Sequence, residues 1–285
     1  MTRTGVPSQL RWSAPSEVKA MNKPLVLLLL SLAIIACVSK APAQSTASGQ
    51  LRVDVAVRSV HVRGDTVEIA HIVHNRRASR DSLFIFIVDA RSGVLHMRRP
   101  EPVRNWAADP DFGGRPMVFW TILQLLLPDS TSPALYYESI GIPGIAKYWV
   151  GGNEHPKGGE DDEPNPNLPP PDPLAEMISG QTVGVEPWPT KRTSLGLLTR
   201  LQALTDRSCS APLSWITSLS LCDKLKNDLN GALQQMPVDR TRTRAYLTNY
   251  VTELSGSGAG TFAPGATSSG YWLLKSNAEI ILSQF

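Results

Sequence analysis

The spacing of apolar residues changes twice along the chain. A continuous apolar run from Leu25 to Val38 comes first. From Leu51 onward, apolar and polar residues alternate, as at Leu51, Val53 and Val55, and this period of two predicts strands with one buried face. After Thr190 the apolar residues recur every three or four positions, which is the spacing of amphipathic helices.

The alternating part predicts a β-sandwich domain over residues 51–190. Gly64-Asp65 predicts the turn of a hairpin between two short apolar runs. The predicted strands are 51–57, 60–62, 67–73, 82–88, 117–126, 134–140, 145–150 and 181–185. Short strands with no helical pattern between them favour an antiparallel, immunoglobulin-like sandwich. The stretch 151–175 is rich in Pro and Gly, and we expect a surface loop that buries almost nothing apolar.

The helical part predicts a small bundle over residues 191–285. Asp239 is placed to cap one helix at its N-terminus and Gly256 to end it, while Ser269 is placed to start the last helix. The apolar stripes that define the first two helices are Leu197, Leu201 and Leu204, then Cys222, Leu225, Leu229 and Ala232. The predicted fold class is therefore multidomain, all-β plus all-α, with a separate core in each part.

Residues 1–43 have the pattern of an N-terminal extension followed by a signal peptide. A basic residue, Lys23, precedes the apolar run, and Ala41-Pro42-Ala43 supplies small residues for cleavage. The run is shorter than the roughly 20 residues of a membrane span. Met21 is the start that this pattern favours, and residues 44–50 then form a linker.

A second outcome of export stays open at Cys37. Ile34-Ile35-Ala36-Cys37 resembles a bacterial lipobox, in which the cysteine is lipidated and becomes the mature N-terminus. The sequence thus predicts a secreted, periplasmic or cell-envelope protein without a transmembrane span in its mature form, either released after Ala43 or anchored by lipid at Cys37.

The charge balance changes when the extension is removed. Five of the 28 basic residues and one of the 25 acidic residues lie before Gln44, which leaves 23 basic and 24 acidic residues and a formal charge of −1. This balance argues against nucleic acid as a partner, because a basic surface is needed to neutralise phosphates.

Cys209 and Cys222 are the two cysteines that remain after Gln44. An isolated pair in an exported protein predicts a disulfide, and closing a loop of this length stabilises a small bundle by about 3 kcal/mol. Neither a third cysteine nor a histidine lies nearby in the sequence, so a zinc site is disfavoured.

The last ninety or so residues resemble the FIMAH/FIVAR-type helical modules of bacterial secreted and surface proteins. The segments with this likeness are Trp215-Ile216, Cys222-Asp223-Lys224-Leu225, Ala245-Tyr246-Leu247, Leu273-Leu274 and Asn277-Ala278. The resemblance implies an extracellular appendage with no catalytic residues. The first part, with Gly141-Ile142-Pro143-Gly144 and Tyr148-Trp149-Val150, looks like an uncharacterised secreted β-sandwich domain.

Two tryptophans are candidates for stacking on a ligand. Trp106 and Trp188 flank predicted loops, whereas Trp120 and Trp149 fall within apolar strands and are expected in the core. Arg63-Gly64-Asp65 spells an integrin-recognition tripeptide at the predicted hairpin tip, but Gly-Asp is also what a tight turn requires, and we interpret it as a turn.

The sequence has only weak patterns for a metal-binding site or a catalytic site. Glu160, Asp161, Asp162 and Glu163 could hold Ca²⁺ but lack the spacing of an EF-hand loop. His71 and His74 are three positions apart, so a strand sends them to opposite faces. Asp109 and Asp111 flank a proline and are interpreted as turn residues, and Gly256–Gly260 has Gly where a nucleophile elbow needs Ser.

The sequence therefore predicts an exported bacterial cell-envelope or secreted protein with a non-catalytic binding or assembly role and no cofactor. Its expected partner is an envelope protein or a glycan. The alternatives are a secreted carbohydrate-active or other hydrolase with a dispersed site, and a Ca²⁺- or small-ligand-binding module.

Overall fold

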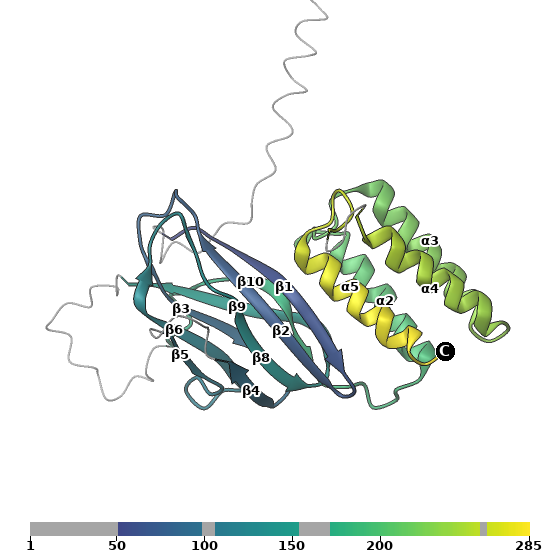
Figure 1. Cartoon of the computed structure of the whole chain (residues 1–285), viewed down its shortest axis with the longest axis horizontal. Helices are drawn as coiled ribbons and strands as arrows, with labels where there is room; N and C mark the ends of the chain where they lie inside the picture. Colours follow the sequence, from purple (N-terminus) through teal and green to yellow (C-terminus); the bar gives the residue numbers. More distant parts are fainter. Residues whose placement is uncertain (1–50, 99–105, 154–171, 257–260) are drawn as a thin grey trace, which may run out of the picture. The chain divides into compact units, whose positions relative to one another are not determined.

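The structure is a computed structural model that describes residues 51–98, 106–153, 172–256 and 261–285. Within these residues, strands come first and helices follow (Figure 1). The strands are β1 (Val53–Arg63), β2 (Thr66–Asn75), β3 (Leu83–Asp89), β4 (Val94–Arg98), β5 (Trp106–Asp109), β6 (Met117–Leu126), β7 (Ser130–Thr131), β8 (Leu135–Ile140), β9 (Ile142–Gly152) and β10 (Ile178–Glu186). The helices are α2 (Ser194–Ser208), α3 (Leu219–Gln235), α4 (Arg240–Leu254) and α5 (Ser268–Leu282).

The strands form two antiparallel sheets, which confirms the predicted β-sandwich. One sheet has the order β1-β2-β8-β4, with β7 also paired to β2, and the other has the order β10-β9-β3-β6-β5. This spatial order corresponds to the ABED and GFCC′C″ sheets of a variable-type immunoglobulin domain. The connections differ, because β4 takes the place of strand D but precedes β5 and β6 in the chain.

The alternating pattern holds along β1, with one interruption. The register between β1 and β2 shifts between Val57 and Ser59, and Val57 and Val60 are both buried. A β-bulge accounts for this, because one extra residue restores the inward direction of the next apolar side chain. The two runs predicted as 51–57 and 60–62 are therefore one strand.

Two parts of the strand prediction are corrected. Strands β4, β5 and β7 were not expected from the sequence, since they are short and β4 has mostly exposed or half-buried residues. Residues 154–171 of the loop predicted for 151–175 lie outside the described residues. At its described end the expectation that it buries almost nothing apolar is corrected, because Leu174 is buried in a second apolar cluster with Ile85, Ile87 and Trp149.

Each helix begins at a side chain that accepts a hydrogen bond from the first turn. These residues are Thr193, Ser218, Asp239 and Thr267, and satisfying the free N–H groups in this way is what favours Ser, Thr and Asp there. The Asp239 prediction is confirmed. The last helix starts after Thr267 rather than at Ser269, and Ser255, directly before Gly256, caps the end of α4.

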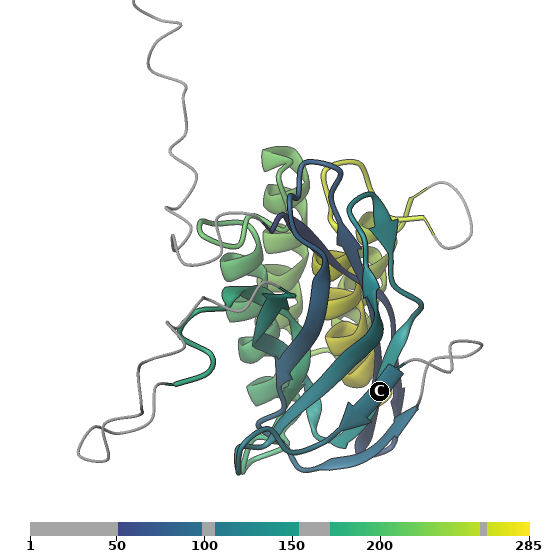
Figure 2. The same ribbon diagram turned by 90° about the vertical axis from the view of Figure 1, so that its left-hand side faces the viewer.

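The four helices pack side by side, with α2 in contact with α3 and α5, and α4 in contact with the same two helices (Figure 1, Figure 2). A buried hydrogen bond of 2.7 Å joins the Thr205 and Tyr250 hydroxyls of α2 and α4. No described helix has the length and apolar character needed to cross a membrane.

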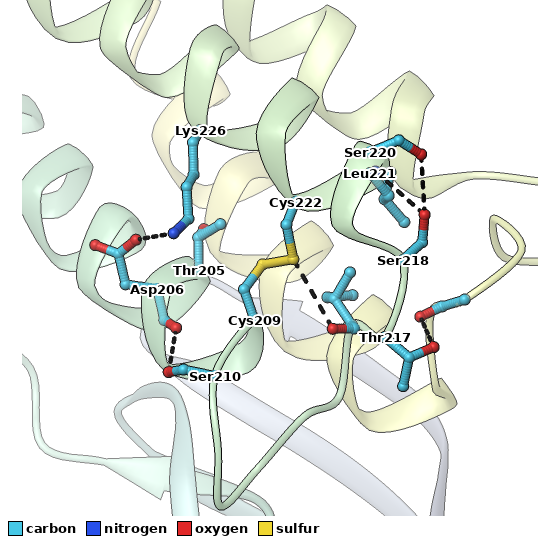
Figure 3. The surroundings of a disulfide bond; sticks show 12 residues. Thr205, Asp206, Cys209, Ser210, Thr217, Ser218, Ser220, Leu221, Cys222 and Lys226 are labelled. Carbon is cyan, nitrogen blue, oxygen red and sulfur yellow. Dashed lines mark hydrogen bonds and ion pairs between the residues drawn. A yellow bond between two sulfur atoms is a disulfide. The ribbon is translucent and has the colours of Figure 1, made fainter. Parts of the chain in front are cut away.

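The predicted disulfide between Cys209 and Cys222 is confirmed (Figure 3). Their Cα atoms are 6.0 Å apart, so the bond ties the end of α2 to the first turn of α3. Lys226 and Asp206 form an ion pair of 2.9 Å beside it, between the same two helices. A disulfide favours an extracellular or periplasmic compartment, where thiols are oxidised.

The strands and helices share one apolar core, and this corrects the expectation of two separate cores. A single cluster of buried side chains runs from strand residues such as Val60 and Ile142 to helix residues such as Leu274 and Ile281. Helix α5 packs against β1 and also contacts β9 and β10. Because β1 and β10 are the terminal strands of their sheets, the helix covers edges that would otherwise be open to pairing with another chain.

Candidate functional site

A cleft of about 660 Å³ lies between the β1–β2 hairpin and α5. One wall is residues 60–65 of the hairpin, and the other is the face of α5 that includes Trp272, Lys275 and Glu279. Trp188 and Arg192, from the segment between β10 and α2, also line it. The volume lies within the range of about 300–1,000 Å³ that is usual for small-ligand sites.

The tip of the hairpin is a tight turn, as predicted for Arg63-Gly64-Asp65. Gly64 has φ of +61° and Asp65 does not have a positive φ, which is the pattern of a type II′ turn. The Asp65 carbonyl accepts hydrogen bonds from the Gly141 N–H at 2.9 Å and from Trp188 Nε1 at 3.4 Å. Its carboxylate forms an ion pair with Arg192 at 2.6 Å, so the tripeptide is docked against the chain and not displayed as a free tip.

Trp188, one of the two stacking candidates, is half-buried and lines the cleft. The Arg192 guanidinium lies 4.5 Å from the centre of its indole ring. This stacking, together with the Arg192–Asp65 ion pair, holds the indole in a fixed place beside the hairpin. Trp188 therefore lines the cleft, and its role in stacking on a ligand stays a prediction.

The prediction that Trp106, the other candidate, stacks on a ligand is wrong. It begins strand β5, is only 5% exposed and belongs to the main apolar core, so its ring is not available to a ligand. The sequence signal failed because the surrounding residues look like a loop, whereas pairing with Ile122 of β6 makes Trp106 part of a sheet. Trp120 and Trp149 are buried, as expected.

The second tryptophan of the cleft, Trp272, was missed by sequence reasoning. It is a half-buried residue of α5, and the Lys275 ammonium lies 5.6 Å from its ring centre. On sequence alone it is one apolar residue among many in an amphipathic helix. The signal that could have singled it out is its spacing from Lys275 and Glu279, which places all three on one helix face.

The charges of the cleft are three cations and two carboxylates. Asp65 pairs with Arg192 at 2.6 Å and Glu279 pairs with Lys275 at 2.5 Å. Within the part of the chain that the structure describes, the Arg63 guanidinium has no ion-pair partner, although it lines the cleft. The cleft therefore has one uncompensated positive charge.

A polar network fixes the helix wall of the cleft against the sheets. The Pro143 carbonyl of β9 accepts hydrogen bonds from Arg200 of α2 at 2.8 Å and from Asn277 of α5 at 3.0 Å. Arg200 also forms an ion pair with Glu186 of β10 at 2.8 Å and donates to the Asn277 side chain. Asn277 is next to the cleft residue Ser276, so this network ties the helix wall of the cleft to β9 and β10.

The structure brings together one cross-sheet row that the sequence concealed. His61, Glu68, Glu138 and His96 lie directly opposite one another on β1, β2, β8 and β4. Arg98 forms an ion pair with Glu68 at 2.5 Å. Among the described residues, those of this row included, no three His, Cys, Asp or Glu side chains are placed to hold a metal ion.

The remaining histidine, carboxylate and cysteine candidates lie as follows. His71 is buried and His74 forms a hydrogen bond with Thr131 on the other face of β2, as expected from their spacing. The Asp109 carboxylate accepts a hydrogen bond from the Asp111 N–H at 2.9 Å, the local bond of a turn. Cys37 and the Ca²⁺ candidates Glu160, Asp161, Asp162 and Glu163 lie outside the described residues.

Comparison with known proteins adds little to this picture. No family model matches the chain, and no curated protein matches it. An uncharacterised protein from Nocardia farcinica with an immunoglobulin-like fold is 14% identical, with a TM-score of 0.27 over 47% of this chain and 98% of that one.

Two structures of a GH20 exo-β-N-acetylglucosaminidase from Vibrio harveyi are also 14% identical. The inactive mutant matches with a TM-score of 0.25, and the complex with N-acetylglucosamine matches with 0.23. Each match covers 50% of this chain and only 19% of the enzyme. These similarities are too weak to assign a function.

Proposed function

We propose that this chain is an exported cell-envelope or secreted protein that binds a ligand or partner without chemical conversion, and that the cleft between the β1–β2 hairpin and α5 is its binding site. The main support is the cleft itself, which has two half-buried tryptophans and a polar rim on walls held rigidly by the core. Concave sites with aromatic walls and a few placed polar groups are the usual form of ligand sites.

The charges of the cleft favour binding over hydrolysis. A hydrolase that acts on glycosidic bonds needs one carboxyl group to donate a proton and a second one to act as base or nucleophile. In the cleft each carboxylate already has a cation as its partner, Arg192 for Asp65 and Lys275 for Glu279. Both carboxylates are therefore already engaged by cations of the chain itself.

Export is the second element of the proposal. The Cys209–Cys222 disulfide agrees with an oxidising compartment, and the leader pattern of residues 1–43 supplies the route. Under this proposal helices α2–α5 are a FIMAH/FIVAR-type appendage, and the sandwich is immunoglobulin-like. The mature chain is either released after Ala43 or anchored by lipid at Cys37.

The binding site can be tested by a screen in which the cleft is changed. The protein is presented to a glycan panel and to purified envelope proteins, alongside Arg63→Glu with Lys275→Glu, which inverts two charges of the cleft. A ligand that binds the native chain, is not shortened or modified, and loses at least tenfold in affinity with the double variant supports the proposal. Unchanged binding by the variant, or turnover of the ligand, contradicts it.

A matched control keeps this test specific. Arg58→Glu with Lys226→Glu changes the same charges at two residues outside the cleft. This control should bind as the native chain does, since its substitutions leave the charge of the cleft untouched.

A further inference from the structure

We infer that the cleft binds an oligosaccharide with a negative charge, such as a chain of uronic acid residues. This inference rests on the proposed function, because it names the class of ligand that the same cleft takes. Two features lead to it: indole rings on two sides of the cleft, and a cation with no partner at its edge.

The first feature concerns the apolar faces of a sugar. Trp188 and Trp272 both line the cleft and are both half-buried. The C–H groups on one side of a pyranose ring form an apolar patch, and a broad indole surface covers such a patch with little loss of side-chain entropy. Because the two tryptophans come from different segments, a ligand of more than one sugar unit can contact both.

The second feature concerns charge. Arg192 is neutralised by Asp65 at 2.6 Å, and Lys275 is neutralised by Glu279 at 2.5 Å. Arg63, in contrast, has no ion pair among the described residues. A guanidinium matches a carboxylate with two parallel hydrogen bonds, and such bonds are stronger than those to a neutral hydroxyl. A carboxylated sugar is therefore expected to bind Arg63 more strongly than a neutral sugar does.

Arg63 and Trp188 are both anchored to the β1–β2 hairpin. Arg63 is the last residue of β1 and is fixed by its register opposite Thr66. Trp188 is held through its Nε1 hydrogen bond to the Asp65 carbonyl, two residues from Arg63. Since the Trp188 indole and the backbone that bears Arg63 are in place before a ligand arrives, only the Arg63 side chain has to be ordered at this end of the cleft.

The test is calorimetric titration with two probes of equal length, tetragalacturonate and the neutral cellotetraose. We expect tetragalacturonate to bind at least tenfold more tightly, because hydrogen bonds to charged groups are worth about a factor of ten or more. Arg63→Gln should remove this preference and leave binding of the neutral sugar unchanged. Arg58→Gln, which changes an exposed arginine of the same strand outside the cleft, should behave as the native protein.

The possible results distinguish a wrong ligand class from a wrong binding site. Equal binding of both probes, or equal behaviour of Arg63→Gln and Arg58→Gln, would overturn the anionic sugar while the cleft stands as a binding site. Absence of binding by either sugar overturns the inference as well. In that case the proposed function survives if the charge-inverted cleft variant loses another ligand from the screen, and fails with the inference if it loses none.

Discussion

The imidazole of His71 lies fully buried between the two sheets. Its Nε2–H donates to the Val183 carbonyl at 2.9 Å, and its ring stacks parallel to Tyr137. Burial disfavours the charged ring and lowers the pKa of His71 from 6.5 to about 4, although the hydrogen bond to Val183 opposes this shift. The native state therefore holds His71 neutral at pH values where an unfolded chain would bind a proton.

This arrangement makes stability depend on pH in a defined window. Between pH 6.5 and pH 4 the unfolded state binds more protons at this position, so stability falls as the pH falls. From the two pKa values of 6.5 and about 4, we expect a loss of about 2 kcal/mol between pH 7.5 and pH 5.

Urea unfolding of the native chain, His71→Gln and His96→Gln at these two pH values tests the assignment. The glutamine amide can keep a bond to the Val183 carbonyl but does not titrate, so His71→Gln should lose most of the pH dependence. His96 is exposed, and its variant should keep that dependence. An unchanged pH dependence in His71→Gln would mean that other groups cause it.

At the scale of elements, much of the strand and helix pattern could be predicted and the exceptions have physical causes. The hairpin at Gly64 and the helix cap at Asp239 follow from local rules about turns and free N–H groups. Strand β5 was missed because it has only four residues, Trp106–Asp109, too few to give an alternating pattern. Its pairing with β6, the next strand along the chain, makes it part of a sheet.

The cleft was harder to predict than the elements that form it. Trp188 was identified because a tryptophan beside prolines in a loop is conspicuous. Trp272 and Arg63 were not identified as cleft residues, since each belongs to a regular element and lines the cleft only because α5 packs against β1. The spacing of Trp272, Lys275 and Glu279 marks one face of α5, but no spacing pattern links that face to the hairpin that forms the other wall.

The disulfide gives a prediction at this scale. Replacing both Cys209 and Cys222 with Ala should lower the free energy of unfolding by about 3 kcal/mol, because the loop between α2 and α3 is no longer closed in the unfolded chain. Urea unfolding of the native protein and the double variant measures this difference. A loss below about 0.5 kcal/mol would indicate that packing around Leu225 and Tyr250 stabilises the bundle without the bond.

At the scale of the whole molecule, the described residues from Leu51 to Phe285 belong to one compact unit. The shared apolar cluster and the bonds from Arg200 and Asn277 to the Pro143 carbonyl join helices and sheets. We therefore expect a single cooperative thermal transition, with equal calorimetric and van't Hoff enthalpies. Two resolved transitions would mean that the sandwich and the bundle unfold independently.

Asn277→Ala sharpens this prediction. The substitution removes one of the two hydrogen bonds to the Pro143 carbonyl and leaves Arg200 Nη1 without the Asn277 oxygen that it donates to. We expect a loss of about 1–3 kcal/mol while the transition stays single. Asn227→Ala, at an exposed position of α3, is the control and should leave the midpoint unchanged. If Asn277→Ala shifted only a helical transition, the contact between the two parts would contribute nothing to stability.

The account as a whole depends on a binding site with one wall from the strands and one from the helices. Hydrogen exchange measured by mass spectrometry, with and without saturating tetragalacturonate, tests this directly. Exchange should slow in both residues 60–65 and residues 272–284, the two walls of the cleft, and stay unchanged in α3. Slowing in only one wall, or only in elements away from the cleft, would contradict the account.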